Sequence, residues 1–133
     1  MLHEPAAGSL APGLLDHVAE GLVTGGIAGF GRALYGPAWD ASCTTVSLAT
    51  VAAEFAMFGA FEPGPVGELA ARVTLTVGEN SPPSRHRAVR ALCDHLGTRL
   101  RVLPGTGHAA HLENGSALVE AVRKECDSAH SDA

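Results

Sequence analysis

Basic side chains are scarce in this chain of 133 residues. Nine lysines and arginines stand against fourteen aspartates and glutamates, which gives a net charge of −5. A phosphate backbone would be repelled by that balance, and the basic residues gather into no stripe. The longest basic run, Arg85–Arg87 with Arg90 one turn later, is typical of a solvated helix face. We therefore expect no nucleic-acid partner.

Cysteine pairs, a targeting segment and long apolar runs are also missing. The three cysteines, Cys43, Cys93 and Cys126, form no C-x-x-C pair, which favours reduced thiols in a cytoplasmic protein. The first five residues carry no basic segment followed by an apolar run, so we expect no signal peptide. Residues 22–35 are apolar but broken by glycines and too short to span a bilayer, so we expect no membrane partner.

What the chain does contain predicts a globular protein of short elements. Hydrophobic residues make up 46% of the sequence and charged residues 17%, and sixteen glycines and eight prolines are spread along it. We expect an irregular lead-in over residues 1–13, a mainly helical section over 14–69, a section of strands and helices over 70–126, and a disordered polar tail over 127–133.

The helical section is expected to hold three helices. Leucine and valine recur at helical spacing over residues 14–22, and Gly25–Gly26 then ends the first helix. The second helix is expected over 27–35 and the third over 44–58, where the composition favours a helix.

The section over 70–126 predicts a β-α-β-α unit. A β-branched run over 72–77 indicates a strand, 85–96 an amphipathic helix, 99–103 a second strand and 112–126 a last helix. Such units build parallel sheets, so the fold class is α/β. Two strands cannot bury both faces of a sheet. We therefore expect the unit to dock on further strands, either from missing sequence or from a second copy of the chain.

The loop between the second strand and the last helix carries the chemistry. His108 lies in the segment Leu103-Pro-Gly-Thr-Gly-His-Ala-Ala-His111, between Gly105 and Gly107 on one side and the helix on the other. Such a loop lies at the carboxyl edge of a parallel sheet, where ligands bind. Histidine titrates near neutral pH, which suits a general base. The alternative is that His108 caps the final helix or bonds a carbonyl.

Two motifs of the chain resemble the end of an α/β-hydrolase domain. They are Val77-Gly-Glu-Asn-Ser-Pro82, after the first strand, and Leu103-Pro-Gly-Thr-Gly-His108, after the second. The resemblance extends over nearly the whole chain, because Leu2-His-Glu-Pro5 is similar to the end of the strand before the family's helical cap, and residues 14–69 would be that cap. It implies that the chain is the C-terminal part of an α/β-hydrolase fold.

The resemblance also assigns roles to individual residues. His108 would be the general base, which deprotonates a serine-type nucleophile and later protonates the leaving group. Many relatives place an aspartate where this chain has Ser81, and a serine cannot stabilise an imidazolium. Some relatives take the acid from the end of the preceding strand, which corresponds to Glu4. We therefore expect Glu4 as the acid and Glu79 as the second choice; otherwise Glu4 is an exposed N-terminal residue.

The nucleophile that this family uses is missing. None of the serines lies in a G-x-S-x-G elbow, Cys43 lacks the strand–turn–helix setting, and the oxyanion-hole loop of the early strands is absent. The serines that fail this test are Ser9, Ser42, Ser47, Ser81, Ser84 and Ser116. We expect a base and an acid in this chain and a nucleophile from elsewhere, or none.

Neither a metal nor a cofactor is expected. His108 and His111 have a spacing that a helix could use to bind a metal, but no third ligand lies at a useful distance along the sequence. In the family interpretation Trp39, Phe55 and Phe58 line an apolar substrate pocket. The alternative is that these aromatic side chains form the core of the cap.

Three functions remain open. The first is a partial or split serine-type hydrolase that acts on a small apolar ester, thioester or lactone and needs the missing N-terminal half of the fold. The second is a non-hydrolytic homodimeric remnant that binds an apolar ligand or assists a cyclisation by acid–base chemistry. The third is an inert interaction module with an unprotected sheet edge.

Overall fold

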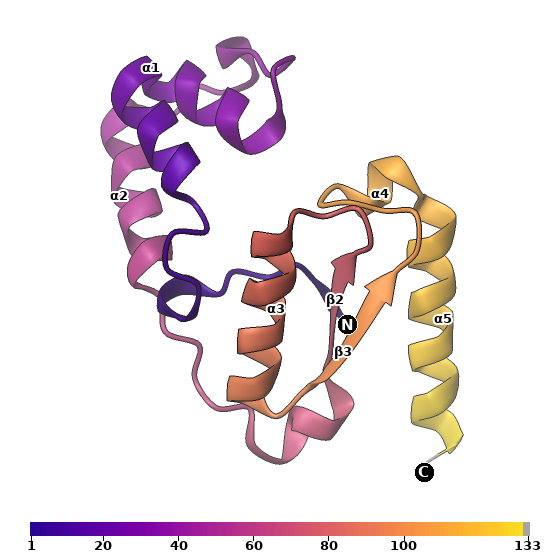
Figure 1. Ribbon diagram of the computed structural model, residues 1–133. Coiled ribbons are helices and arrows are strands. Elements are labelled where there is room, and N and C mark those ends of the chain that lie inside the picture. Colours follow the sequence, from indigo (N-terminus) through magenta and orange to yellow (C-terminus); the bar gives the residue numbers. More distant parts are fainter. Residues whose placement is uncertain (132–133) are drawn as a thin grey trace. The chain divides into compact units, whose positions relative to one another are not determined.

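The computed structural model describes residues 1–131, with side chains described through Asp127. Two compact units share the chain, and Figure 1 shows their elements. One unit combines Met1–Ala11 with Glu62–Ala133, and the other is the segment Pro12–Phe61 between them. Each unit is described below by itself.

The first unit is built on a small parallel sheet. Its strands are β1 (Leu2–His3), β2 (Thr74–Gly78) and β3 (Arg99–Leu103), and β2 lies in the middle. Five residue pairs join β2 to β3, from Thr74 with Arg99 to Gly78 with Leu103, whereas only two pairs join β1 to β2. Helix α3 (Pro83–Leu96) connects β2 to β3. All three strands therefore end at the same edge of the sheet.

The alternation of β2 explains how both faces of the sheet are covered. Leu75 and Val77 are fully buried and pack against Val89 and Leu92 of α3, in the main hydrophobic core. The side chain of Thr74 points to the other face, where its hydroxyl donates to Glu125 of α5 (Gly115–Ser131) at 2.6 Å. In Figure 1, α3 and α5 flank the sheet. The period of two in the strand thus separates an apolar face from a polar one.

Glu125 joins α5 to both neighbouring strands. Besides the Thr74 hydroxyl, its carboxylate contacts Arg99 at 3.1 Å and Arg101 at 2.9 Å. A second, smaller cluster packs α5 on the end of β3 through Leu103 and Ala121. The helix is therefore fixed by apolar contacts near its start and by charge-assisted hydrogen bonds near its end.

The segment Pro12–Phe61 is a helical unit. Helix α1 (Asp16–Tyr35) contains a break at Gly26, whose φ of 57° and ψ of −145° are not helical. The two halves come so close that a Cβ on Gly21 would lie 2.7 Å from the Gly29 carbonyl oxygen. Helix α2 (Leu48–Ala60) packs on α1. Glycine is therefore required here both for the turn and for the close approach.

The structure confirms a mixed helix and strand chain with a parallel sheet and corrects several boundaries. The expected strand over 72–77 begins at Thr74, because Gly67–Arg72 forms a 3-10 helix. The expected helix over 112–126 is interrupted at Asn114, between α4 (Ala110–Glu113) and α5.

The ends of two expected sections differ as well. The compact helical unit ends at Phe61, whereas the sequence predicted a helical section over 14–69. The disordered tail expected from residue 127 is wrong up to Ser131, because α5 continues that far. Residues 132–133 of that expected tail lie outside the described residues. Among residues 1–131, none of the helices is long and apolar enough to cross a membrane.

Candidate functional site

Glu4 begins the site at the end of the shortest strand. Its backbone N–H still donates to the Thr76 carbonyl at 2.8 Å, and its φ of 40° then turns the chain away from β2. The Glu4 side chain is fully buried in the first unit. The expectation that Glu4 is an exposed N-terminal residue is therefore wrong.

Four groups surround the Glu4 carboxylate. Its Oε1 accepts hydrogen bonds from the Gly78 backbone N–H at 3.0 Å and from the Ser81 hydroxyl. Its Oε2 lies 2.9 Å from Nδ1 of His108 and 3.8 Å from Nε of Arg85. All of these groups lie at or beyond the carboxyl end of a strand, where ligands bind in open parallel sheets.

These contacts keep Glu4 charged in spite of its burial. Burial raises the pKa of a carboxyl group, but the hydrogen bonds from His108, Ser81 and Gly78 and the charge of His108 more than offset it. The net effect lowers the pKa of Glu4 from 4.5 to about 2. At neutral pH the site therefore holds a buried carboxylate.

The carboxylate fixes the orientation of the His108 ring. Because a carboxylate only accepts, Nδ1 must carry the proton in this contact, and the proton-accepting nitrogen of the neutral ring is then Nε2. No side chain or carbonyl of the described residues bonds Nε2, and the His108 side chain is 47% exposed. The ring is thus held on one side and open on the other, as a general base requires.

Two further carboxylates hold the loop that carries His108. Glu113 accepts from the backbone N–H of Gly107 and from that of Ala109 at 3.3 Å, on both sides of the histidine. Glu79 accepts from the Gly105 N–H at 2.8 Å. The loop backbone is therefore fixed around His108.

Close packing brings the two strand ends together. A Cβ on Gly78 would lie 2.5 Å from the Thr106 carbonyl oxygen and 2.6 Å from that of Gly107. His3 spans the same junction, with Nδ1 at 3.0 Å from the Thr76 hydroxyl and Nε2 at 3.1 Å from the Gly107 carbonyl. The loop can thus approach β2 only because residue 78 has no side chain.

The structure brings together some of the expected residues and not others. Glu4 contacts His108, and Glu79, the second choice for the acid, binds the loop backbone instead. Ser81, which occupies the usual acid position, donates to Glu4. Arg85 is not on a solvated face, since its side chain is only 17% exposed beside Glu4.

The three aromatic residues expected to line a pocket belong to the helical unit. Trp39 packs over Gly31 and stacks on Tyr35, with ring centroids 6.4 Å apart. Phe55 meets Phe30 edge to face. Phe58 is about half exposed. The described contacts of Trp39 and Phe55 are packing contacts within their own unit.

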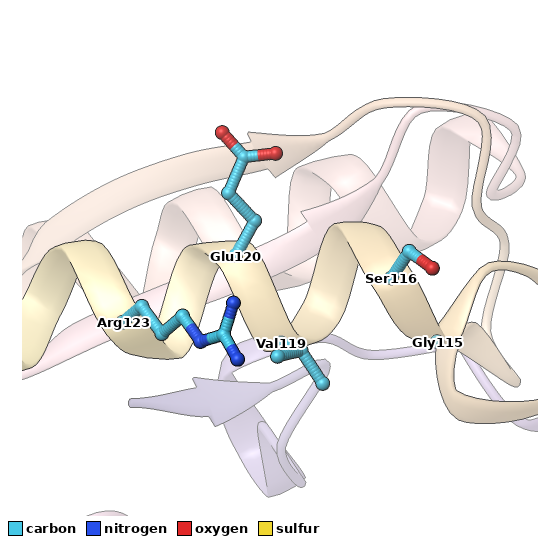
Figure 2. A pocket seen from close by; sticks show the side chains of 5 residues that line it. All are labelled: Gly115, Ser116, Val119, Glu120 and Arg123. Atoms are coloured by element: carbon cyan, nitrogen blue, oxygen red, sulfur yellow. The ribbon is translucent and has the colours of Figure 1, made fainter.

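Two other features lie apart from Glu4 and His108. His111 is exposed, and the described part of the chain contains no group of three residues that could hold a metal ion. A shallow hollow on α5 is lined by Gly115, Ser116, Val119, Glu120 and Arg123 (Figure 2). Those five residues belong to one helix, and none of them is among the hydrogen-bond or ion-pair partners described for Glu4 and His108.

Comparison with known proteins assigns the chain to no family. No family model, curated protein or solved structure matches the chain. The functional argument therefore depends on the geometry around Glu4 and His108.

Proposed function

We propose that Glu4 and His108 are the acid and the base of a serine-type hydrolase of the α/β-hydrolase kind. The substrate would be a small apolar ester, thioester or lactone. The observation that carries this proposal is a buried carboxylate on Nδ1 of a half-exposed histidine whose Nε2 is open. The same arrangement of acid and base serves nucleophilic hydrolases on several unrelated folds.

In this mechanism Nε2 of His108 takes the proton of an attacking hydroxyl and later gives it to the leaving group. Glu4 remains ionised throughout and stabilises the imidazolium that forms between these steps. Ser81 is an unsuitable nucleophile, because its hydroxyl donates to the Glu4 carboxylate. The nucleophile would therefore come from a segment or partner that supplies the N-terminal half of the fold.

The base can be tested without that partner by using an activated ester. An oriented imidazole attacks p-nitrophenyl acetate directly, so we expect His108-dependent release of p-nitrophenol. His108→Ala should lower the second-order rate constant about tenfold, which is below the usual contribution of a positioned base. The matched control is His111→Ala, which removes an exposed histidine of the same loop region and should leave the rate unchanged. Equal rates for the two variants would refute the assignment of His108.

A fluorophosphonate probe then tests for the nucleophile. The chain alone should resist labelling, because no elbow serine is present. A serine-bearing partner should be labelled when it is mixed with the wild-type chain and not when it is mixed with His108→Ala. Labelling that does not depend on His108 would contradict the proposal.

A second candidate is a homodimer that uses the same pair for acid–base chemistry without a nucleophile. The observation that favours it is that Glu4 and His108 meet within one chain. It predicts a discrete dimer in analytical ultracentrifugation, with no fluorophosphonate labelling under any condition. A monomer that gains activity only with a serine-bearing partner would exclude it.

A further inference from the structure

Arg85 lies beside the proposed acid and base. It is in the first turn of α3, and its Nε is 3.8 Å from Oε2 of Glu4. The same carboxylate oxygen contacts Nδ1 of His108. A substrate bound at His108 is therefore close to the Arg85 guanidinium.

The guanidinium has hydrogen-bonding capacity that the protein does not use. A separation of 3.8 Å is an ion-pair contact and is too long for a hydrogen bond. The backbone N–H of Arg85 donates to the Pro82 carbonyl at 2.9 Å, but among the described residues no acceptor bonds the N–H groups of its guanidinium. By contrast, Arg99 and Arg101 both bind Glu125.

The donors of Arg85 nevertheless reach the surface. The only fully buried side-chain polar atom without a partner, among the described residues, is Oγ1 of Thr98. The nitrogens of Arg85 are therefore open to a ligand, although its side chain is only 17% exposed. A charge that is largely desolvated and still accessible favours binding of an anion.

The need to stabilise the charge of Glu4 does not explain why an arginine lies beside it. Burial raises the pKa of Glu4, and the bonds from His108, Ser81 and Gly78 more than offset it. Both carboxylate oxygens thus have hydrogen-bond donors before Arg85 is considered.

We propose that Arg85 binds a carboxylate of the substrate, so that the site takes an otherwise apolar ester bearing one carboxylate. This inference rests on the proposed function and narrows its substrate class. The planar fork of a guanidinium matches a carboxylate with two parallel hydrogen bonds. A phosphate dianion fits less well, because the other arginines of α3, Arg87 and Arg90, are exposed to solvent and neither is an ion-pair partner of Glu4 as Arg85 is.

The activity test compares two esters on the full chain. One is the mono-p-nitrophenyl ester of trans-cyclohexane-1,4-dicarboxylic acid, and the other is p-nitrophenyl cyclohexanecarboxylate. The trans ring keeps the carboxylate from attacking its own ester. We expect the wild-type chain to prefer the anionic ester about tenfold, as one charge-assisted hydrogen bond would give.

Substitutions of Arg85 test whether the preference for the anionic ester comes from its guanidinium. Arg85→Gln should abolish it and Arg85→Lys should keep part of it. The matched control is Arg87→Gln, which removes an exposed arginine two residues after Arg85 and should keep the whole preference. An equal rate with both esters in the wild type, or a preference that survives Arg85→Gln, would overturn the inference.

A binding measurement separates this inference from the proposed function. In the ¹⁵N-labelled chain, cyclohexanecarboxylate should shift the Nε–H signal of Arg85, and the neutral cyclohexylmethanol should not. The signal should be absent in Arg85→Gln while the backbone spectrum stays dispersed, which shows that the variant is folded. A shift at Arg85 without His108-dependent ester cleavage would refute the hydrolase alone. Cleavage without a shift would refute the role of Arg85 alone.

Discussion

Replacing Glu4 with glutamine would measure what a buried carboxylate contributes to this fold. The glutamine carbonyl can still accept from Gly78 and Ser81, so the variant removes the charge and keeps most of the shape. Because the folded pKa of Glu4 lies below its unfolded value, its contribution is complete above about pH 4.5 and is lost as the pH falls towards 2.

The size of the effect follows from the pKa. Burial raises the pKa of Glu4, but the bonds from His108, Ser81 and Gly78 lower it to about 2 from 4.5. Each unit of that difference is worth about 1.4 kcal/mol. The ionised carboxylate therefore contributes about 3 kcal/mol to the free energy of unfolding at pH 7, and about 2 kcal/mol of this should be lost by pH 3.

The assay is urea unfolding at several pH values between 7 and 3, followed by far-ultraviolet circular dichroism. The single Trp39 and the single Tyr35 both lie in Pro12–Phe61, so tryptophan fluorescence reports on that unit and not on the sheet. Glu54→Gln is the control, since Glu54 is an exposed residue of α2.

The decisive quantity is the difference in the free energy of unfolding between the wild type and Glu4→Gln. The other carboxylates titrate in both proteins and cancel in that difference. We expect it to shrink by about 2 kcal/mol from pH 7 to pH 3. A difference that stays constant over this range would show that Glu4 has an ordinary pKa, and the site described above would then be wrong.

Two glycine substitutions, Gly78→Ala in the sheet unit and Gly26→Ala in the helical unit, test positions where the structure requires glycine, and each is compared with a glycine in open space. Gly78→Ala should destabilise the sheet unit by about 3 kcal/mol, because the new Cβ would meet two loop carbonyls. Gly59→Ala is its control: this glycine lies in open space on α2, and the substitution should stabilise the chain by about 0.5–1 kcal/mol. Thermal melts followed by circular dichroism would show both effects, and equal melting temperatures would contradict the close approach at residue 78. Gly26→Ala should lower the stability seen by Trp39 fluorescence by about 1–3 kcal/mol, since its φ is positive. Gly25→Ala is its neighbour and control, and similar losses in the two would argue against the break at Gly26.

The sequence predicts those elements whose signal is local. The β-branched residues of β2 and the period of α3 are read directly from the chain, and both elements are found. The break between α4 and α5 was missed, although a signal was present. The Asn114 side chain accepts from the Ala117 N–H at 3.2 Å, as an N-cap residue does, and it also reaches the Pro104 carbonyl.

The site is predictable only in part, for a physical reason. The glycine loop marks His108, and the family resemblance pointed to Glu4 as its partner. The position of Arg85 could not be predicted, because its neighbour Glu4 is far away in sequence and no local pattern encodes their contact. The contact of Glu113 with the His108 loop is different, because it joins residues that are close in sequence. A carboxylate five residues after His108 is therefore a local signal from which this contact could have been predicted.

Glu4 also helps to hold its own strand, β1, in the sheet. Only two ladder pairs join β1 to β2, and a whole helical unit separates β1 from the rest of the sheet in sequence. Closing so long a connection costs entropy that two ladder pairs alone offset poorly. The remaining bonds come from His3, which reaches the Gly107 carbonyl, and from Glu4, whose carboxylate binds Gly78, Ser81 and His108. Docking of β1 and formation of the Glu4–His108 contact are therefore one event, and any change that frees β1 removes the Glu4 carboxylate from His108 without altering the histidine itself.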